Sequence, residues 1–147
     1  MQSSEVLTNV RAPKVARARR LLKRGFRESD GLFLAEGPQA CREAAKAGKV
    51  KELFLTQEAL DRYAEIVAAV DESGAEIIVC TEAVIAQFSS TVSPQGMTAV
   101  VRMWDQDPSD LFKSGNKLVV ALTAVRDPGN AVSVIRVSDA AGAHGVV

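Results

Sequence analysis

Short apolar runs alternate with amphipathic segments from Leu32 to Met103, and this alternation restricts the chain to few folds. The apolar runs predict strands at 32–35, 50–55, 76–80 and 97–103. Helices are predicted at 38–47 and 58–72, and a short one follows the capping residue Thr81 and ends near Phe88. Strands that alternate with helices in this way are typical of a layered α/β domain.

An uneven charge distribution distinguishes the N-terminal end. The formal net charge is zero, yet residues 1–27 contain eight lysines and arginines against Glu5 alone, so this segment carries +7. This end of the protein is therefore expected to attract a polyanion, although the net charge of zero gives no indication of such a partner. The absence of any acidic residue between Arg11 and Arg27 favours nucleic acid over a merely solvated surface.

This basic segment is predicted to form a helix over 13–24. Pro13 suits a first turn, and Val15, Ala18 and Leu22 recur at helical spacing on one face. Cations follow the same period on the opposite face. The residues expected to contact RNA are Arg11, Lys14, Arg17, Arg20, Arg24 and Arg27.

Composition excludes several other classes. Cys41 and Cys80 lie far apart without CxxC spacing and His144 is the sole histidine, so no metal site is expected. The cysteines are interpreted as small buried hydrophobes. No apolar run approaches the roughly 18–20 residues that cross a bilayer, and residues 1–10 lack the order of a signal peptide. A cytoplasmic protein without membrane association is expected.

A second, shorter segment follows a polar stretch at 105–116, which is interpreted as a linker. The domain before this linker is assigned residues 1–104. Beyond it, a strand at 117–123, a helix and the start of another strand at Gly145 predict one βαβ unit. Because a single such unit buries little surface, residues 117–147 are expected to be the incomplete start of a domain.

The most specific pattern lies within this βαβ unit. Its residues are Val125-Arg126-Asp127-Pro128-Gly129-Asn130, Ile135-Arg136 and Ser138-Asp139-Ala140-Ala141-Gly142-Ala143. An isolated Asp-Pro-Gly-Asn is an ordinary turn. In this order and spacing, however, the residues resemble motif 1 of the SpoU/TrmH branch of the SPOUT methyltransferases. Val132 departs from that motif by replacing a glycine, and Val137-Ser138 replaces Thr-Ala.

Four upstream segments carry the same resemblance. They are Phe33-Leu34-Ala35-Glu36-Gly37, the predicted helix that follows it as far as Lys46, Lys51-Glu52-Leu53-Phe54 and Ser93-Pro94-Gln95-Gly96. These segments are similar to the N-terminal substrate-binding domain of the family. The resemblance implies an α/β fold: an N-terminal ribosomal-protein-like RNA-binding domain, then the first βαβ portion of a SPOUT domain that is truncated before its trefoil knot.

The family resemblance also implies a reaction. It implies that the complete protein is an RNA ribose 2'-O-methyltransferase that uses S-adenosylmethionine (AdoMet) and forms a homodimer. Large-subunit 23S rRNA is the expected substrate, and tRNA is the alternative. The cofactor pocket is expected to lie outside this chain, so the chain alone should be inactive and should not bind AdoMet measurably.

Two residues are assigned catalytic roles by the resemblance. Arg136 is the arginine of the motif, and Asn130 would orient the 2'-hydroxyl or the substrate. Because the pKa of a guanidinium lies above about 12, a charged Arg136 that stabilises the developing alkoxide is favoured over a general base. The alternatives are that Arg136 faces water or pairs with Asp139, and that Asp127 merely caps the following helix.

Two other functions fit parts of the sequence. Residues 1–104 would suit a non-catalytic RNA-binding protein. A nucleotide-binding module would use the helix N-terminus at Asn130 to hold a phosphate, but the glycine-rich patterns of such sites are absent from the sequence.

Overall fold

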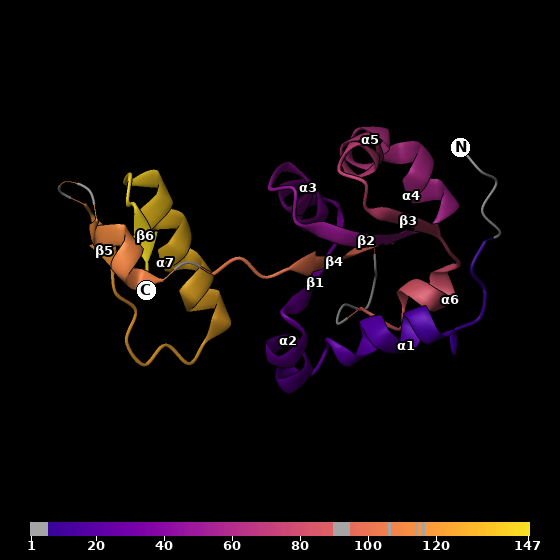
Figure 1. Cartoon of the computed structure of the whole chain (residues 1–147), viewed down its shortest axis with the longest axis horizontal. Helices are drawn as coiled ribbons and strands as arrows, with labels where there is room; N and C mark the ends of the chain where they lie inside the picture. Colours follow the sequence, from indigo (N-terminus) through magenta and orange to yellow (C-terminus); the bar gives the residue numbers. More distant parts are fainter. Residues whose placement is uncertain (1–5, 90–94, 106, 114, 116) are drawn as a thin grey trace. The chain divides into compact units, whose positions relative to one another are not determined.

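The computed structural model describes residues 6–89, 95–105, 107–113, 115 and 117–147 (Figure 1). The chain divides into two compact units, Met1–Met103 and Trp104–Val147. The predicted linker at 105–116 contains the 3-10 helix η1 (Pro108–Phe112), which belongs to the second unit. The functional assignment of each unit remains a prediction.

The first unit is built on a four-stranded mixed sheet. Its strands are β1 (Leu32–Glu36), β2 (Val50–Leu55), β3 (Glu76–Val79) and β4 (Met97–Arg102). They are ordered β1-β4-β2-β3, and β4 is antiparallel to both of its neighbours, whereas β2 and β3 are parallel. The parallel pair requires a crossover, which the two helices between β2 and β3 provide.

Helices cover both faces of this sheet (Figure 1). One face packs against α3 (Pro38–Lys46), α4 (Gln57–Arg62) and α5 (Ala64–Glu72), and the other packs against α1 (Pro13–Arg20) and α6 (Glu82–Ile85). Strand β2 supplies both cores, because Leu53 and Leu55 face the first set of helices and Phe54 faces the second. The predicted layered α/β architecture is confirmed.

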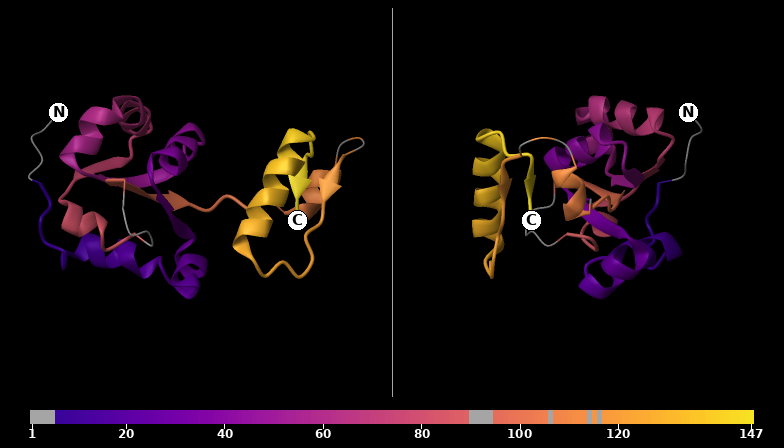
Figure 2. Two further views of the ribbon diagram at one scale, coloured as in Figure 1. Left: turned by 180° about the vertical axis from the view of Figure 1, so that it is seen from behind. Right: turned by 60° about the vertical axis from the view of Figure 1, so that its left-hand side comes forward.

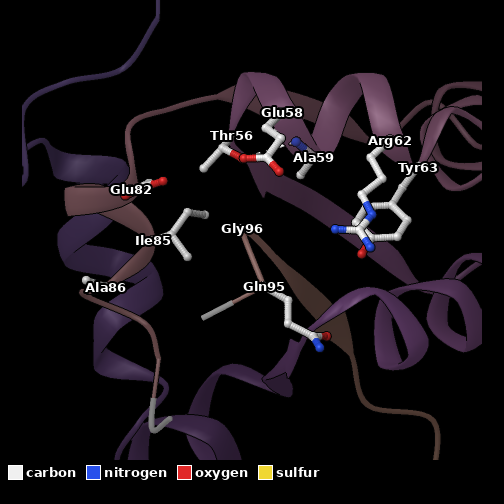
Figure 3. A pocket seen from close by; sticks show the side chains of 10 residues that line it. All are labelled: Thr56, Glu58, Ala59, Arg62, Tyr63, Glu82, Ile85, Ala86, Gln95 and Gly96. Atoms are coloured by element: carbon white, nitrogen blue, oxygen red, sulfur yellow. Dashed lines mark hydrogen bonds between the residues drawn. The ribbon is translucent and has the colours of Figure 1, made fainter. Parts of the chain in front are cut away.

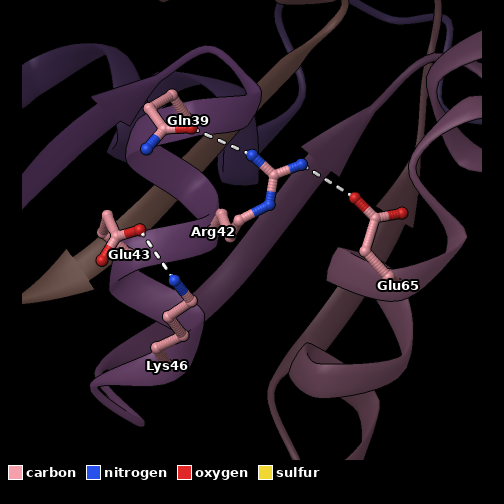
Figure 4. A network of polar contacts seen from close by, with 5 residues as sticks. All are labelled: Gln39, Arg42, Glu43, Lys46 and Glu65. Atoms are coloured by element: carbon pink, nitrogen blue, oxygen red, sulfur yellow. Dashed lines mark hydrogen bonds and ion pairs between the residues drawn. The ribbon is translucent and has the colours of Figure 1, made fainter.

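Polar contacts join α3 to α5 above the sheet (Figure 4). Arg42 on α3 donates from Nη2 to Oε1 of Glu65 on α5 at 2.8 Å, and from Nη1 to Oε1 of Gln39 at 3.0 Å. The hydrogen bond from Arg42 lowers the pKa of the Glu65 carboxyl group. Lys46 pairs with Glu43 one turn away at 3.1 Å. These contacts lie on the exposed surface, where ion pairs add little to stability.

The predicted helix over 13–24 is wrong in its extent. Helix α1 ends at Arg20, and a separate helix, α2 (Arg24–Asp30), begins after the extended residue Lys23. The N–H of Leu21 turns back to the carbonyl of Ala18, which tightens the last turn. Leu21 is consequently 3% exposed and belongs to the core. Leu22, which was predicted to lie on the apolar face of the helix, is 45% exposed.

Other predicted elements are present but shorter. The helix predicted over 58–72 is broken at Tyr63, whose φ of −119° and ψ of 43° are not helical. The helix expected to end near Phe88 ends at Ile85. The strand predicted over 117–123 is reduced to β5 (Val119–Val120). In each case the type of element is right and its boundary is wrong.

The second unit is a βαβ arrangement, as expected. Helix α7 (Pro128–Ala140) connects β5 to β6 (Gly145–Val146), which pair in parallel, and Figure 2 shows this helix beside the two strands. The N–H of Leu122 extends the pairing to the carbonyl of Val147 at 2.6 Å. The strands remain only partly buried in this small unit.

Candidate nucleic-acid interface

Three of the basic residues predicted to contact RNA are paired with acidic residues. Lys14 forms an ion pair with Glu76, and Arg24 donates from Nε to Oε1 of Glu28 at 2.7 Å, which raises the pKa of its guanidinium. Arg20 lies 3.6 Å from a carboxylate oxygen of Asp30. All three pairs are on the surface, where an ion pair is worth about 1 kcal/mol or less. A polyanion can therefore compete for these cations.

A fourth predicted contact, Arg27, has a structural role. Its Nη1 donates to the main-chain carbonyl oxygens of Leu21 and Leu22, each at 3.0 Å. These carbonyls follow the end of α1 and lack helical partners. Arg20 packs nearby, with its guanidinium carbon 4.2 Å from the ring centroid of Phe26. The break between the two helices is thus held by two arginines.

The remaining cations are available to a ligand. Arg11, Arg17, Arg19 and Lys23 are exposed, and within the described parts of the chain no side-chain hydrogen bond or ion pair engages them. Arg17 also lines a cavity of about 310 Å³ together with Lys51 on β2, another exposed cation, whose side chain has no ion pair with any residue that the structure describes. Sequence reasoning missed Arg19, Lys23 and Lys51, although the high cation density of residues 11–24 signalled the first two.

Asp127 caps the N-terminus of α7. Its Oδ1 accepts hydrogen bonds from the N–H groups of Gly129 at 2.6 Å and Asn130 at 3.1 Å. The carboxylate therefore satisfies two of the four N–H groups that an α-helix leaves without partners at its start. The geometry agrees with the alternative in which Asp127 caps the helix and has no role in catalysis.

The two predicted catalytic residues lie at different places on α7. Asn130 is in the first turn and Arg136 is six residues further on, which separates them by roughly 9 Å along the axis and about 120° around it. Both are exposed, and neither side chain has a hydrogen bond or ion pair within the described residues. Helix α7 alone therefore does not bring them together. Of the two alternatives for Arg136, its exposure agrees with the one in which it faces water, and no ion pair with Asp139 is present among the described residues.

The departures from motif 1 are accommodated without strain. Val132, which replaces the glycine, is 54% exposed, so the helix does not press it against another element of this unit. Ser138 is buried and its hydroxyl donates to the carbonyl of Val134 at 2.7 Å. The larger side chains thus leave the helix intact.

Two of the upstream segments, 33–37 and 93–96, meet at one end of the sheet, where β1 ends and β4 begins. Gly37 has a φ of 84°, and its N–H donates to the carbonyl of Met97 at 2.9 Å. A Cβ atom at Gly37 would lie 3.1 Å from Oε1 of Gln95. The residues Ser93 and Pro94 of the second segment lie outside the described residues. The end of the sheet that carries Gly37 and Gln95 is therefore a junction of segments far apart in the chain.

Asn130, Val132 and Arg136, the motif residues at which a cofactor contact was considered, are all exposed. Among the described residues, no three histidine, cysteine or acidic side chains lie together so that they could hold a metal ion. Cys41 and Cys80 are free and buried, as predicted. No helix in the described ranges is long and apolar enough to span a bilayer.

His144 is exposed, as expected, but it has a structural contact. Its Nδ1 accepts a hydrogen bond from the N–H of Leu118 at 3.3 Å, and its own N–H donates to the carbonyl of Leu118 at 2.8 Å. The residue thus helps to align the entry to β5 with the entry to β6.

Comparison with known proteins identifies the family of the first unit. Residues 12–99 match the family model described as the MRM3-like substrate binding domain. The chain is 31% identical over 135 residues to the 23S rRNA (guanosine(2553)-2'-O)-methyltransferase RlmP of Bacillus subtilis. That alignment covers 91% of this chain and 50% of the relative, so the chain spans half the length of RlmP.

Solved structures extend the match into the second unit. The AdoMet-bound rRNA methyltransferase from Sinorhizobium meliloti aligns with a TM-score of 0.80 and 28% identity over 97% of this chain and 53% of its own. The SpoU methyltransferase AviRb from Streptomyces viridochromogenes, in complex with AdoMet, aligns with a TM-score of 0.75 and 26% identity over 92% of this chain and 52% of its own. The resemblance to SpoU/TrmH-type enzymes is thereby confirmed: the chain belongs to the MRM3-like substrate-binding domain family, which joins it to the SPOUT RNA methyltransferases.

Proposed function

We propose that this chain provides the RNA-binding part and the first catalytic segment of an AdoMet-dependent rRNA ribose 2'-O-methyltransferase. The observation that carries the proposal is the match of residues 12–99 to a substrate-binding domain, combined with an exposed basic helix in those residues. Large-subunit 23S rRNA is the proposed substrate, because RlmP is named for that RNA. Residues 1–104 form the proposed substrate-binding domain and residues 117–147 the start of the catalytic one.

RNA is proposed to bind along α1 and the turn that follows it. Arg11, Arg17, Arg19 and Lys23 are the first contacts, because no acidic partner holds them in the described structure. Lys14, Arg20 and Arg24 can join them by exchanging exposed carboxylates for phosphates. Arg27 holds the break between α1 and α2 and is not proposed as an RNA contact.

The catalytic roles proposed for α7 depend on positioning. Asn130 would orient the ribose 2'-hydroxyl, and the charged Arg136 would stabilise the alkoxide that develops as the hydroxyl loses its proton. Since the two residues are on different faces of the helix, further protein must complete the site around them. AdoMet supplies the methyl group when it is bound in that completed site.

The complete enzyme is proposed to be a homodimer that is located in the cytoplasm. Val132 and Ile135 lie three residues apart on one side of α7 and are both exposed, which supports burial of that side against additional protein.

An assay of methyl transfer tests this function, with protein expressed from the full coding region. The protein is incubated with 23S rRNA and AdoMet that carries a labelled methyl group. A methylated ribose resists alkaline cleavage of the adjacent phosphodiester, because the 2'-oxygen can no longer attack the phosphate. Label in alkali-resistant dinucleotides is expected, and an Arg136→Lys variant should be strongly impaired because a lysine cannot reproduce the planar guanidinium. RNA binding without any methyl transfer would instead support the non-catalytic RNA-binding alternative.

A further inference from the structure

A cavity of about 420 Å³ opens between α4 and α6, beside the end of β2 (Figure 3). Its volume falls within the roughly 300–1,000 Å³ that is usual for sites that bind small molecules. Ligands in α/β proteins commonly bind where parallel strands end, and β2 is one of the two parallel strands. The residues that line the cavity are Thr56, Glu58, Ala59, Arg62, Tyr63, Glu82, Ile85, Ala86, Gln95 and Gly96.

The walls combine an apolar surface with a stacking platform. Ile85 and Ala59 are almost fully buried and present hydrocarbon to the cavity. On the α4 side, the guanidinium carbon of Arg62 lies 5.4 Å from the ring centroid of Tyr63. Guanidinium and aromatic planes are the surfaces on which RNA-binding proteins stack single bases. A flat heterocycle is therefore a suitable occupant.

The polar groups of the cavity are available to that occupant. Glu58 and Glu82 are exposed, and no described residue forms a hydrogen bond or ion pair with their side chains. Figure 3 shows Glu58 on the α4 side of the opening and Glu82 on the α6 side. The lining contains two carboxylates and one guanidinium, that of Arg62, and is therefore net acidic. This charge disfavours the binding of a phosphate. Carboxylates accept hydrogen bonds, so a ligand with N–H donors is favoured.

Gly96 keeps the base of the cavity open. Its φ of 70° is in the left-handed region, and a Cβ atom there would lie 2.8 Å from Oγ1 of Thr56. That hydroxyl oxygen is already engaged, since it accepts the N–H of Ala59 at 3.2 Å and caps α4. The carbonyl of Gly96 also accepts the N–H of Thr56 at 2.9 Å. The backbone contact between these segments thus fixes the shape of the cavity.

We propose that this cavity binds one unstacked guanine base of the RNA substrate. Guanine is planar and presents the adjacent N1–H and N2–H donors on its Watson–Crick edge, and one carboxylate, that of Glu58 or of Glu82, can accept from both. RNA loops offer such bases because they splay them out of the helix. The inference rests on the RNA binding proposed above and adds a base-reading site distinct from the basic surface of α1.

Base preference in short RNA tests the proposal on the full chain. Three fluorescein-labelled single-stranded oligouridines carry guanosine, inosine or adenosine at their centre, and their Kd values are measured by fluorescence anisotropy. The guanosine probe is expected to bind about tenfold more tightly than the adenosine probe, as for a bidentate contact to a base. Inosine, which lacks the 2-amino group, is expected to fall between them.

Matched variants separate the cavity from general electrostatics. The double change Glu58→Ala with Glu82→Ala is expected to reduce the guanosine preference to less than about twofold. Asp71→Ala with Glu72→Ala removes two exposed carboxylates of α5 that do not line the cavity, and it is expected to keep the preference. Equal binding of the three probes, or a preference that survives the loss of Glu58 and Glu82, would overturn the guanine site while leaving RNA binding intact. Failure of every probe to bind would overturn both.

Discussion

Nη1 of Arg27 lies 3.0 Å from the main-chain carbonyl oxygen of Leu21, across the break that separates α1 from α2. The same nitrogen donates to the carbonyl of Leu22. A cation at the C-terminal end of a helix also interacts favourably with the helix dipole. One arginine of the basic segment is therefore used to hold the surface that carries the others.

Arg27→Ala should lower stability without weakening RNA contacts directly. Loss of the two hydrogen bonds is expected to reduce the free energy of unfolding by about 1–2 kcal/mol, measured by urea denaturation. RNA affinity, measured at a temperature at which the variant is folded, should match the parent protein. Arg19→Ala is the control, because its exposed side chain has no described partner and should change stability by less than about 0.5 kcal/mol. A stable Arg27→Ala protein with impaired RNA binding would contradict this assignment.

Asp127→Ala should weaken the start of α7. The loss of a capping carboxylate typically costs about 1 kcal/mol, and Asp127 accepts from two N–H groups. Amide hydrogen exchange at Gly129 and Asn130 is expected to accelerate by roughly fivefold, whereas Asp127→Asn should restore most of the protection. Asp139→Ala, on the same helix but without a capping contact, should leave both amides unchanged. Unaltered exchange in Asp127→Ala would show that the carboxylate does not hold the helix.

Both cysteine thiols should be inert in the folded protein. Burial raises the pKa of Cys41 and of Cys80 from the ordinary value of 9.0 to about 12, so neither forms the reactive thiolate at pH 8. Iodoacetamide is expected to modify them only after unfolding in urea, as read by mass spectrometry. Because the folded pKa is the higher one, the stability that these neutral thiols contribute is present below about pH 9 and is lost as the pH rises toward 12. Rapid modification of the native protein would contradict the buried positions.

Strand positions were predictable because they depend on local alternation. The run around Leu53 to Leu55 places side chains on the two faces of the sheet in turn, and this period is visible in the sequence. The helix breaks at Leu21 and Tyr63 were not predictable, because they depend on tertiary contacts. Arg27 stabilises the first break from six residues away, and Tyr63 packs against the core at the second.

The candidate interface was predicted in outline and corrected in detail. The basic segment was identified by composition, but the partners of its cations come from elsewhere: Glu76, which pairs with Lys14, is 62 residues away. A helical period does not reveal a pair between residues so far apart. The sequence therefore could not show that Lys14 has an acidic partner whereas Arg11 and Arg17 do not, among the described residues. The cavity around Arg62 was missed because its lining comes from separate segments that only the fold assembles.

The salt dependence of RNA binding tests the central claim most directly. The Kd for a labelled 23S rRNA hairpin is measured over a series of KCl concentrations for the parent chain, for Arg17→Ala with Arg19→Ala, and for the control Lys117→Ala with Arg126→Ala, which removes two exposed cations of the second unit. Each phosphate contact contributes about 0.7–0.9 to the slope of log affinity against log salt. The parent chain should lose affinity steeply as salt increases, the Arg17 and Arg19 variant should have a slope shallower by roughly 1.4–1.8, and the control should retain the parent slope. A flat salt response in the parent chain, or an unchanged slope after the loss of Arg17 and Arg19, would contradict RNA binding through α1.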